Sequence, residues 1–204
     1  MDLIARAGLD GVTVRDVALA AGYSTAVVSH YFHNKKELLF LTYRGSIDRA
    51  SERSDRAVAE DGGANLKGYL CEIMPLDDVR LTEWKIWLAF WGKAVTDEEI
   101  AAEQRECVRS TRGKILDILD QVHERGDLVA GVDREHVARQ VLALITGMAI
   151  EVMFDTEDWP AERQHELIDR ELRAIYQPSR LPRSVGPGPA ANTAGAAGAR
   201  VAAE

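Results

Sequence analysis

The sequence predicts an all-α protein with a small helical unit at the N-terminus and a larger helical body after it. Apolar residues recur at helical spacing through most of the chain, whereas the strict alternation typical of strands is scarce. The six prolines lie mostly near the expected ends of helices or in the C-terminal tail. A chain of 204 residues is long enough to build one large or two small hydrophobic cores.

Residues 13–32, TVRDVALAAGYSTAVVSHYF, have the pattern of two short helices that cross at a tight turn. Gly22 lies at the expected turn, where only glycine adopts a positive φ without steric cost. Ser24 is placed to cap the second helix, and Thr13 with Asp16 is placed to cap the first. The pattern predicts a helix-turn-helix and therefore contact with DNA, and an ordinary helical hairpin is the alternative. The expected contacts between the two helices come from Val17, Ala18, Ala21, Val28 and Tyr31.

The other helices are separated where glycine, proline and capping residues interrupt the apolar spacing. Asn34, with Glu37 three residues on, is placed to cap a long helix whose polar second half predicts a connector rather than a core element. Thr96 is the expected cap of a later helix. The predicted helices span residues 1–7, 35–60, 65–74, 81–95, 96–125, 133–155 and 161–176. These patterns predict a DNA-binding domain over residues 1–45, a helical body over 46–177 and a disordered tail over 178–204.

Charge is unevenly divided along this acidic chain. The whole chain carries −8 at neutral pH, but residues 1–45 carry +1, which leaves −9 on the remainder. An acidic protein binds DNA through a local basic patch, and a set this small predicts that two protomers are needed. The basic residues that could form this patch are Arg6, Arg15, Lys35, Lys36 and Arg44.

The remaining composition narrows the class of protein. No apolar run approaches the roughly 20 residues of a membrane span, and no signal sequence stands out, so we expect a soluble cytoplasmic protein without a membrane partner. Cys71 and Cys107 are far apart and have no histidine at metal-ligand spacing, so we expect free thiols, no metal site and no cofactor. No catalytic arrangement or phosphate-binding glycine loop stands out, so an enzyme is the weakest alternative.

The segment AGYSTAVVSHYFHNKKELL resembles the TetR family of bacterial repressors, in which a helix-turn-helix ending in Tyr-Phe precedes a polar turn, a lysine and a long fourth helix. The resemblance implies that the second helix of the motif enters the major groove and that Lys35 binds phosphate. Tyr31 either packs between the helices or reaches a phosphate. TetR-like proteins usually begin further upstream, so we expect a truncated first helix. The implied DNA contacts are Thr13, Ser24, Thr25, Ala26, Val27, Ser29, His30, Tyr31 and Lys35.

Residues 82–95, TEWKIWLAFWGKAV, place three indoles on one helical face. Such a stripe is either core packing or the wall of a ligand cavity, and a cavity beside Glu83 would suit a cationic or flat aromatic effector. Together with AAEQRECVRSTR, this segment is similar to the choline-responsive, BetI-like branch of the family, which implies a related effector-binding body. The candidate effector-binding residues are Glu83, Trp84, Trp87, Leu88 and Trp91.

The last two predicted helices carry more apolar residues than packing within one protomer needs, and TetR-like proteins dimerise by joining these helices from both chains. For any one of these residues, burial within its own protomer is the alternative. The candidate interface residues are Val141, Met148, Val152, Met153, Leu167, Ile168, Leu172 and Ile175. Together these features predict a homodimeric repressor that a small-molecule effector releases from operator DNA, and an activator or a ligand-independent regulator of the same fold is the alternative.

Overall fold

The computed structural model describes residues 11–32 and 34–178. Within these ranges the chain forms eight α-helices and no strand, which confirms the all-α prediction. The predictions for the first helix, for Arg6 and for the tail from residue 179 concern residues outside these ranges. The helices are α2 (Val14–Ala20), α3 (Thr25–Tyr31), α4 (Lys35–Ala59), α5 (Leu66–Ile73), α6 (Asp78–Ala94), α7 (Glu98–Glu124), α8 (Arg134–Phe154) and α9 (Ala161–Ile175).

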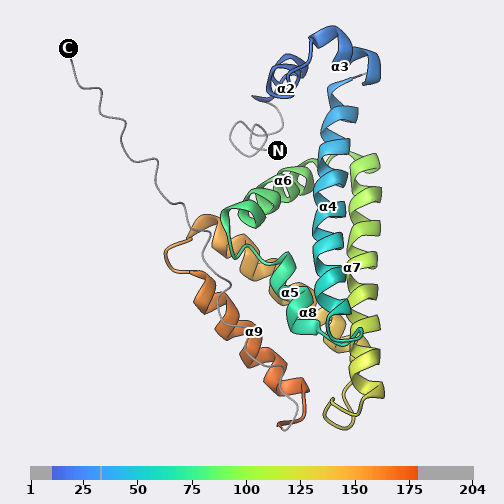
Figure 1. Ribbon diagram of the computed structural model, residues 1–204, viewed down its shortest axis with the longest axis vertical. Helices are drawn as coiled ribbons and strands as arrows, with labels where there is room; N and C mark the ends of the chain where they lie inside the picture. Colours follow the sequence, from blue (N-terminus) through green and yellow to red (C-terminus); the bar gives the residue numbers. More distant parts are fainter. Residues whose placement is uncertain (1–10, 33, 179–204) are drawn as a thin grey trace, which may run out of the picture.

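Two short helices, α2 and α3, form a head at one end of the molecule (Figure 1). Thr13 and Asp16 cap α2 reciprocally: the Thr13 hydroxyl accepts from the Asp16 N–H at 3.2 Å, and the Asp16 carboxylate accepts from the Thr13 N–H at 2.9 Å. Gly22 has a φ of +73°, and Ser24 Oγ accepts from the Val27 N–H at 3.3 Å. The predicted sequence of cap, turn and cap is therefore confirmed. The head is held together by a small hydrophobic cluster of Ala18, Val28 and Leu38, with Val14, Val17 and Phe32 packed against it.

The helix α4 runs without interruption for 25 residues from the head along the body (Figure 1). Asn34 caps it by accepting from the Glu37 N–H at 2.9 Å, as predicted. The predicted domain boundary at residue 45 therefore falls inside a helix that head and body share. The prediction that the second half of α4 is not a core element is wrong. Ala50, Ser54 and Val58 are buried, because small side chains four residues apart form one face on which α5 packs.

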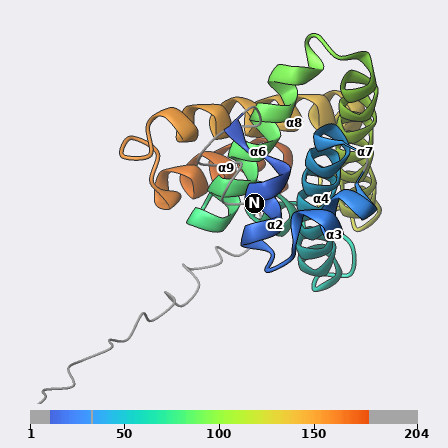
Figure 2. The same cartoon turned by 90° about the horizontal axis from the view of Figure 1, so that it is seen from above.

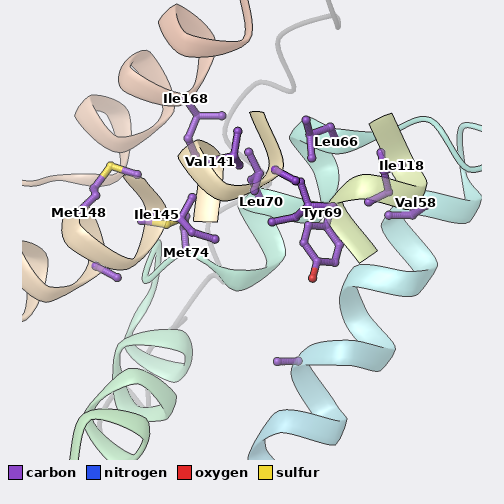
Figure 3. Close-up of a cluster of buried hydrophobic side chains, with 14 of the residues drawn as sticks. Val58, Leu66, Tyr69, Leu70, Met74, Ile118, Val141, Ile145, Met148 and Ile168 are labelled. Atoms are coloured by element: carbon purple, nitrogen blue, oxygen red, sulfur yellow. The ribbon is translucent and has the colours of Figure 1, made fainter. Parts of the chain in front are cut away.

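The body packs its helices around one large core. The helices α4 and α7 lie side by side along the molecule, and α8 crosses behind them and leads to α9 (Figures 1 and 2). Figure 3 shows the centre of this core, where side chains from α4, α5, α7, α8 and α9 meet. The residues labelled there are Val58, Leu66, Tyr69, Leu70, Met74, Ile118, Val141, Ile145, Met148 and Ile168. Residues far apart in the sequence thus build the body.

Two helices begin at residues other than those predicted. The helix α6 begins three residues earlier, because the carboxylate of Asp77 accepts from the Arg80 N–H at 2.8 Å and caps it there. The helix α7 is capped by Asp97 rather than by Thr96, and the Asp97 carboxylate accepts from two backbone N–H groups of the first turn. Aspartate and threonine are both good caps, so a sequence that offers the two in succession leaves the start of the helix open.

The helix α8 is long and apolar. An 18-residue stretch of this 21-residue helix reaches a mean hydropathy of 1.6, so by length and composition alone the helix could cross a membrane, and the prediction that no run approaches this length is wrong. The core helix of a soluble protein meets the same criteria, and α8 packs against α6 and α7. Only 39% of its most apolar stretch is buried. A face of α8 that carries both apolar and polar residues is therefore uncovered in the single chain.

Candidate functional sites

The helix α3 presents nearly all of its side chains to solvent. Val28 is the exception, because it turns into the cluster that holds the head together. One inward valine is enough to fix the helix and leaves the rest of its surface available to a partner. The exposed residues are Thr25, Ala26, Val27, Ser29, His30 and Tyr31, and the caps Thr13 and Ser24 are exposed as well. The structure thus brings the predicted DNA contacts of α3 onto one small, accessible helix, and their contact with DNA stays a prediction.

Tyr31 does not pack between α2 and α3. Its side chain is 70% exposed, and its ring meets the ring of His30 edge-on, with the centroids 5.4 Å apart. The inward row of α3 runs from Val28 to Phe32, four residues on, and this row turns Tyr31 away from the cluster. Ala21 is exposed too. The packing interpretation of Tyr31 and Ala21 is therefore wrong, and a phosphate contact of the Tyr31 hydroxyl stays a prediction.

Two residues of the predicted basic set are engaged by acidic residues of α7 and its cap. Lys36 Nζ lies 2.8 Å from carboxylate oxygens of both Asp97 and Glu99, and Arg44 donates two hydrogen bonds of 2.7 Å to Glu103. Hydrogen bonds from these cations lower the pKa of Asp97 and that of Glu103, and the same bonds raise the pKa of Lys36 and that of Arg44. The supply of phosphate-binding charge is smaller than predicted, and these pairs instead tie the head end of α4 to α7.

The other described members of the basic set are Arg15 and Lys35. Arg15 is exposed on α2, and Lys35 is half-buried at the first position of α4. Hydrogen bonds from the Thr13 side chain and backbone lower the pKa of Asp16, and the charges of Arg15 and Lys35 act in the same direction. Both side chains are candidates for phosphate contact, and the contact of Lys35 stays a prediction.

The tryptophan face packs mainly as core. Trp84 and Trp87 are 3% and 8% exposed, and each indole N–H has a partner: Trp84 donates to the Ile73 carbonyl at 2.7 Å, and Trp87 to Ser46 Oγ at 2.8 Å. The ring of Trp84 meets those of Trp87 and Trp91 edge-to-face at centroid distances of 5.1 and 5.6 Å. The three indoles form one cluster, as their spacing predicts. Two of them are held by the protein itself, so their contact with an effector stays a prediction.

Trp91, the third indole, lines an open groove of about 420 Å³ between the end of α6 and α7. The half-buried Leu88 is not part of its lining. The groove is largely apolar, and its charged members are three arginines on α7. A groove without a carboxylate suits an anion or a neutral apolar compound better than a cation. The lining residues besides Trp91 are Ala94, Val95, Ala101, Gln104, Arg105, Val108, Arg109 and Arg112.

Glu83 is the one fully buried carboxylate among the described residues, and α4 supplies its counter-charge. Arg53 donates from Nη1 to Oε1 at 3.1 Å and from Nη2 to Oε2 at 2.6 Å, which is a two-pronged ion pair. The hydrogen bonds to Glu83 raise the pKa of Arg53. Arg53 Nε lies 3.5 Å from Glu72, and Arg80 donates to the same carboxylate at 3.2 Å. The predicted anionic wall is thus neutralised from within the protein.

The predicted dimer contacts divide into two groups. Five of the eight are 6% exposed or less in the single chain, because α8 and α9 pack against α5, α6 and α7. These five are already buried within their own protomer, and their contact with a second protomer stays a prediction. Met153, Leu167 and Ile175 are half-buried and stay candidates. The five buried residues are Val141, Met148, Val152, Ile168 and Leu172.

Sequence reasoning missed an apolar strip on the outward face of α8. Ala143 and Gly147 are exposed, Ile150 is half-buried and Phe154 is 79% exposed. These residues are three or four positions apart and therefore share one face. Their spacing was visible in the sequence. Arg53 was missed as well, because it stands in a polar run where nothing marks it as the partner of a buried carboxylate.

Two family models match this chain. The model described as "Bacterial regulatory proteins, tetR family" matches residues 1–41, and the model described as "BetI-type transcriptional repressor, C-terminal" matches residues 63–177. The second match covers more than half of the chain. Most of α4 lies between the two matches.

Individual relatives and solved structures agree with these matches. The transcriptional regulator BetI of Burkholderia lata is 37% identical over 97 residues, which are 46% of this chain and 50% of the relative, so this chain spans about half the length of that protein. A transcriptional regulator from Rhodococcus has a similar structure, with a TM-score of 0.72 and 27% identity over 85% of this chain and 90% of that one. A regulator from Saccharomonospora viridis, solved with choline, has a TM-score of 0.68 and 24% identity over 86% and 92%.

Proposed function

Because this chain belongs to the TetR family of bacterial regulators and carries a BetI-type C-terminal domain, we propose that it is a homodimeric repressor that a small-molecule effector releases from its operator. DNA-binding regulation of transcription follows from the family. The dimer, the repression and the release by an effector are the proposal. The observation that carries it is the exposed face of α3, which α4 joins without interruption to a helical body.

We assign the reading of DNA sequence to the exposed face of α3. Ala26 and Val27 offer methyl groups to thymine, and His30 offers a ring N–H to guanine or phosphate. Lys35 contacts a phosphate of the DNA backbone and does not contribute to sequence preference. The small number of basic side chains in one head supports a second head, set one turn of DNA away.

The uncovered face of α8 supports the dimer. The strip from Ala143 through Gly147 to Phe154 is apolar and largely exposed, and an added Cβ at Gly147 would meet no atom within 4 Å. Small residues let two helices approach closely, and Phe154 adds a large apolar contact at the end of the strip. We place the contact between protomers on this strip, with Met153, Leu167 and Ile175 at its margin.

Release from the operator would follow from the position of α4. The helix connects the head to the body, so an effector that shifts α4 changes the separation of the two heads and weakens their fit to the operator. The Saccharomonospora regulator holds choline, and we propose a cationic or flat aromatic compound as the effector of this chain, with quaternary ammonium compounds as the first class to test.

Operator mapping with the purified full-length protein tests the DNA contacts. Lys35→Ala is expected to weaken binding to all sequences alike and to reduce the slope of log affinity against log salt by about one. His30→Ala is expected instead to change sequence preference at one base position of each half-site. If the two variants change affinity and preference in the same way, the division of roles is wrong.

A charge on the α8 strip tests the dimer. Gly147→Glu is expected to halve the mass measured by light scattering and to abolish tight operator binding, because a carboxylate cannot be buried unpaired between two helices. Ala102→Glu, on the exposed side of α7, adds the same charge away from the strip and is the matched control. A Gly147→Glu protein that keeps its dimer mass would contradict the proposed interface.

A further inference from the structure

We propose that the effector binds by exchange: its positive group takes the place of the Arg53 guanidinium on the buried carboxylate of Glu83. Arg53 is then a built-in competitor that occupies the cation subsite until an effector arrives. This inference rests on the proposed function, because it names the site and the chemistry of the effector that the proposed function requires. It starts from the two-pronged pair of Arg53 and Glu83.

The burial of Glu83 dictates a one-for-one exchange. The Glu83 side chain is 2% exposed, whereas that of Arg53 is 23% exposed. A carboxylate buried this deeply is strongly destabilised when it loses its counter-charge, so one cation must be present at all times. Arg53 and an effector cation can each fill that role, but they cannot fill it together. The site therefore has two stable occupants and no stable empty state.

A second carboxylate, that of Glu72, lies close enough to pair with Arg53 when its guanidinium leaves Glu83. Its Nε is buried and makes no hydrogen bond, so its pairing in the present position is incomplete. Glu72 lies 3.5 Å from this Nε, and its carboxylate is 26% exposed. A long side chain such as arginine can keep its stem packed while the charged group moves toward water. Arg53 can thus keep its contact with Glu72, which also accepts from Arg80 at 3.2 Å, while its guanidinium turns toward solvent, and the exchange leaves neither charge unpaired.

The surroundings of Glu83 suit a cation with an apolar body. Trp87 stands one turn after Glu83 on α6 and therefore shares its face, and the ring of Trp84 meets that of Trp87 edge-to-face at 5.1 Å. An indole face attracts a desolvated cation, and a quaternary ammonium is desolvated far more easily than a small hydrated ion. The groove beside Trp91 is less suited to a cation, because the charged residues that line it are arginines.

The exchange couples the effector to the head. Arg53 belongs to α4 and Glu83 to α6, so their ion pair ties the middle of α4 to the body. Nearer the head, α4 is tied to α6 by the hydrogen bond from Trp87 to Ser46. An effector on Glu83 removes the first of these ties and leaves the second, which lets the middle of α4 move about a fixed point. Because linkage is reciprocal, operator DNA and effector weaken each other's binding.

Calorimetric titration of the full-length protein without DNA tests the exchange. The probe is choline chloride, and the control ligand is its neutral isostere 3,3-dimethyl-1-butanol. Removing the competitor by Arg53→Met is expected to tighten choline binding by at least about tenfold, because the apparent affinity of a site is its intrinsic affinity multiplied by the fraction of molecules in which the site is vacant. The exposed Arg56 lies on the same helix three residues on, so Arg56→Met is the matched control and is expected to bind like the wild type.

Two further variants keep the test decisive if Arg53→Met does not fold. Arg53→Lys keeps a positive charge but loses the second prong, and it is expected to bind choline about threefold tighter than the wild type. Glu83→Gln is expected to abolish the preference for choline over the neutral isostere. The exchange is overturned if the Arg53 variants that fold bind choline no tighter than the wild type, or if Glu83→Gln keeps that preference.

Operator release, measured separately, distinguishes the two proposals. Tighter choline binding by the Arg53 variants, with no release of the wild type from its operator by choline, would support the exchange and contradict choline as an effector. Release of the wild type by choline, with Arg53 variants that bind it no tighter, would support the proposed function and overturn the exchange alone.

Discussion

The head and the body of this molecule are built in different ways. The head depends on a cluster of three buried residues and on caps whose partners are three residues apart. The body depends on a large core and on pairs such as Arg53 with Glu83, which are 30 positions apart. Local chemistry therefore specifies the part that we propose to read DNA, and long-range packing specifies the part that we propose to respond to an effector.

The same truncation in both cores is expected to give the largest effect and to separate the two regions. Leu119 is completely buried in the body, and Leu119→Ala should reduce the free energy of unfolding by about 2–5 kcal/mol. Leu38 belongs to the small cluster of the head, and Leu38→Ala should lower operator affinity with a smaller fall in the thermal midpoint of the body. Thermal denaturation and operator titration of both variants measure this difference. Equal falls in the midpoint would show that head and body unfold as one unit.

A glycine-to-alanine change is expected to have opposite signs in the two regions. Gly22 has a φ of +73°, so Gly22→Ala should destabilise the head by about 1–2 kcal/mol and weaken operator binding. Gly92 lies in α6, and an added Cβ there would meet no atom within 4 Å, so Gly92→Ala should stabilise the body by about 0.5–1 kcal/mol. Chemical denaturation measures both values. A Gly22→Ala protein with unchanged operator affinity would contradict the role of this turn.

The contrast also explains what the sequence could and could not predict. The caps Thr13, Ser24 and Asn34 and the turn at Gly22 were predicted correctly, because each depends on residues within one turn of a helix. The partner of Glu83 was not predicted, because no local pattern marks Arg53. The sequence of one segment determines whether it forms a helix and which of its faces is apolar. Charge pairing in the body depends instead on how separate segments pack against each other.

Apolar periodicity identifies a buried stripe but not the helix that covers it. Ile168 and Leu172 were predicted to contact a second protomer, yet packing within their own chain leaves them only 1% and 2% exposed. Two of the uncovered residues of α8, Ala143 and Gly147, are small, and a search for large apolar side chains passes over them. The tryptophan face is a second example. Its three indoles were correctly predicted to share one face, but the residues that accept hydrogen bonds from Trp84 and Trp87 were not predicted.

Loss of a cap is expected to have an effect of about 1 kcal/mol in either region, but with different consequences. Thr13→Ala should loosen α2, increase hydrogen exchange of the head amides and lower operator affinity. Asp133 caps α8 by accepting from the His136 N–H at 3.0 Å, so Asp133→Ala should lower the stability of the body and leave head exchange unchanged. Hydrogen exchange resolved by residue distinguishes the two. Increased head exchange in Asp133→Ala would mean that the regions are more tightly coupled than their contacts indicate.

The smallest expected effect concerns an ion pair that joins the head end of α4 to the body. Arg44 lowers the pKa of Glu103 below its ordinary value of 4.5, so the pair stabilises the fold above that value, and this contribution is lost as pH falls through the lowered pKa. The thermal midpoint of the wild type should therefore fall more steeply between about pH 5 and pH 3 than that of Glu103→Gln. Glu106→Gln is the control, because the Glu106 carboxylate lies 3.7 Å from Arg109 on the same helix, so this pair stays within α7. Equal slopes for the wild type and Glu103→Gln would mean that this contact adds nothing to the connection between the two regions.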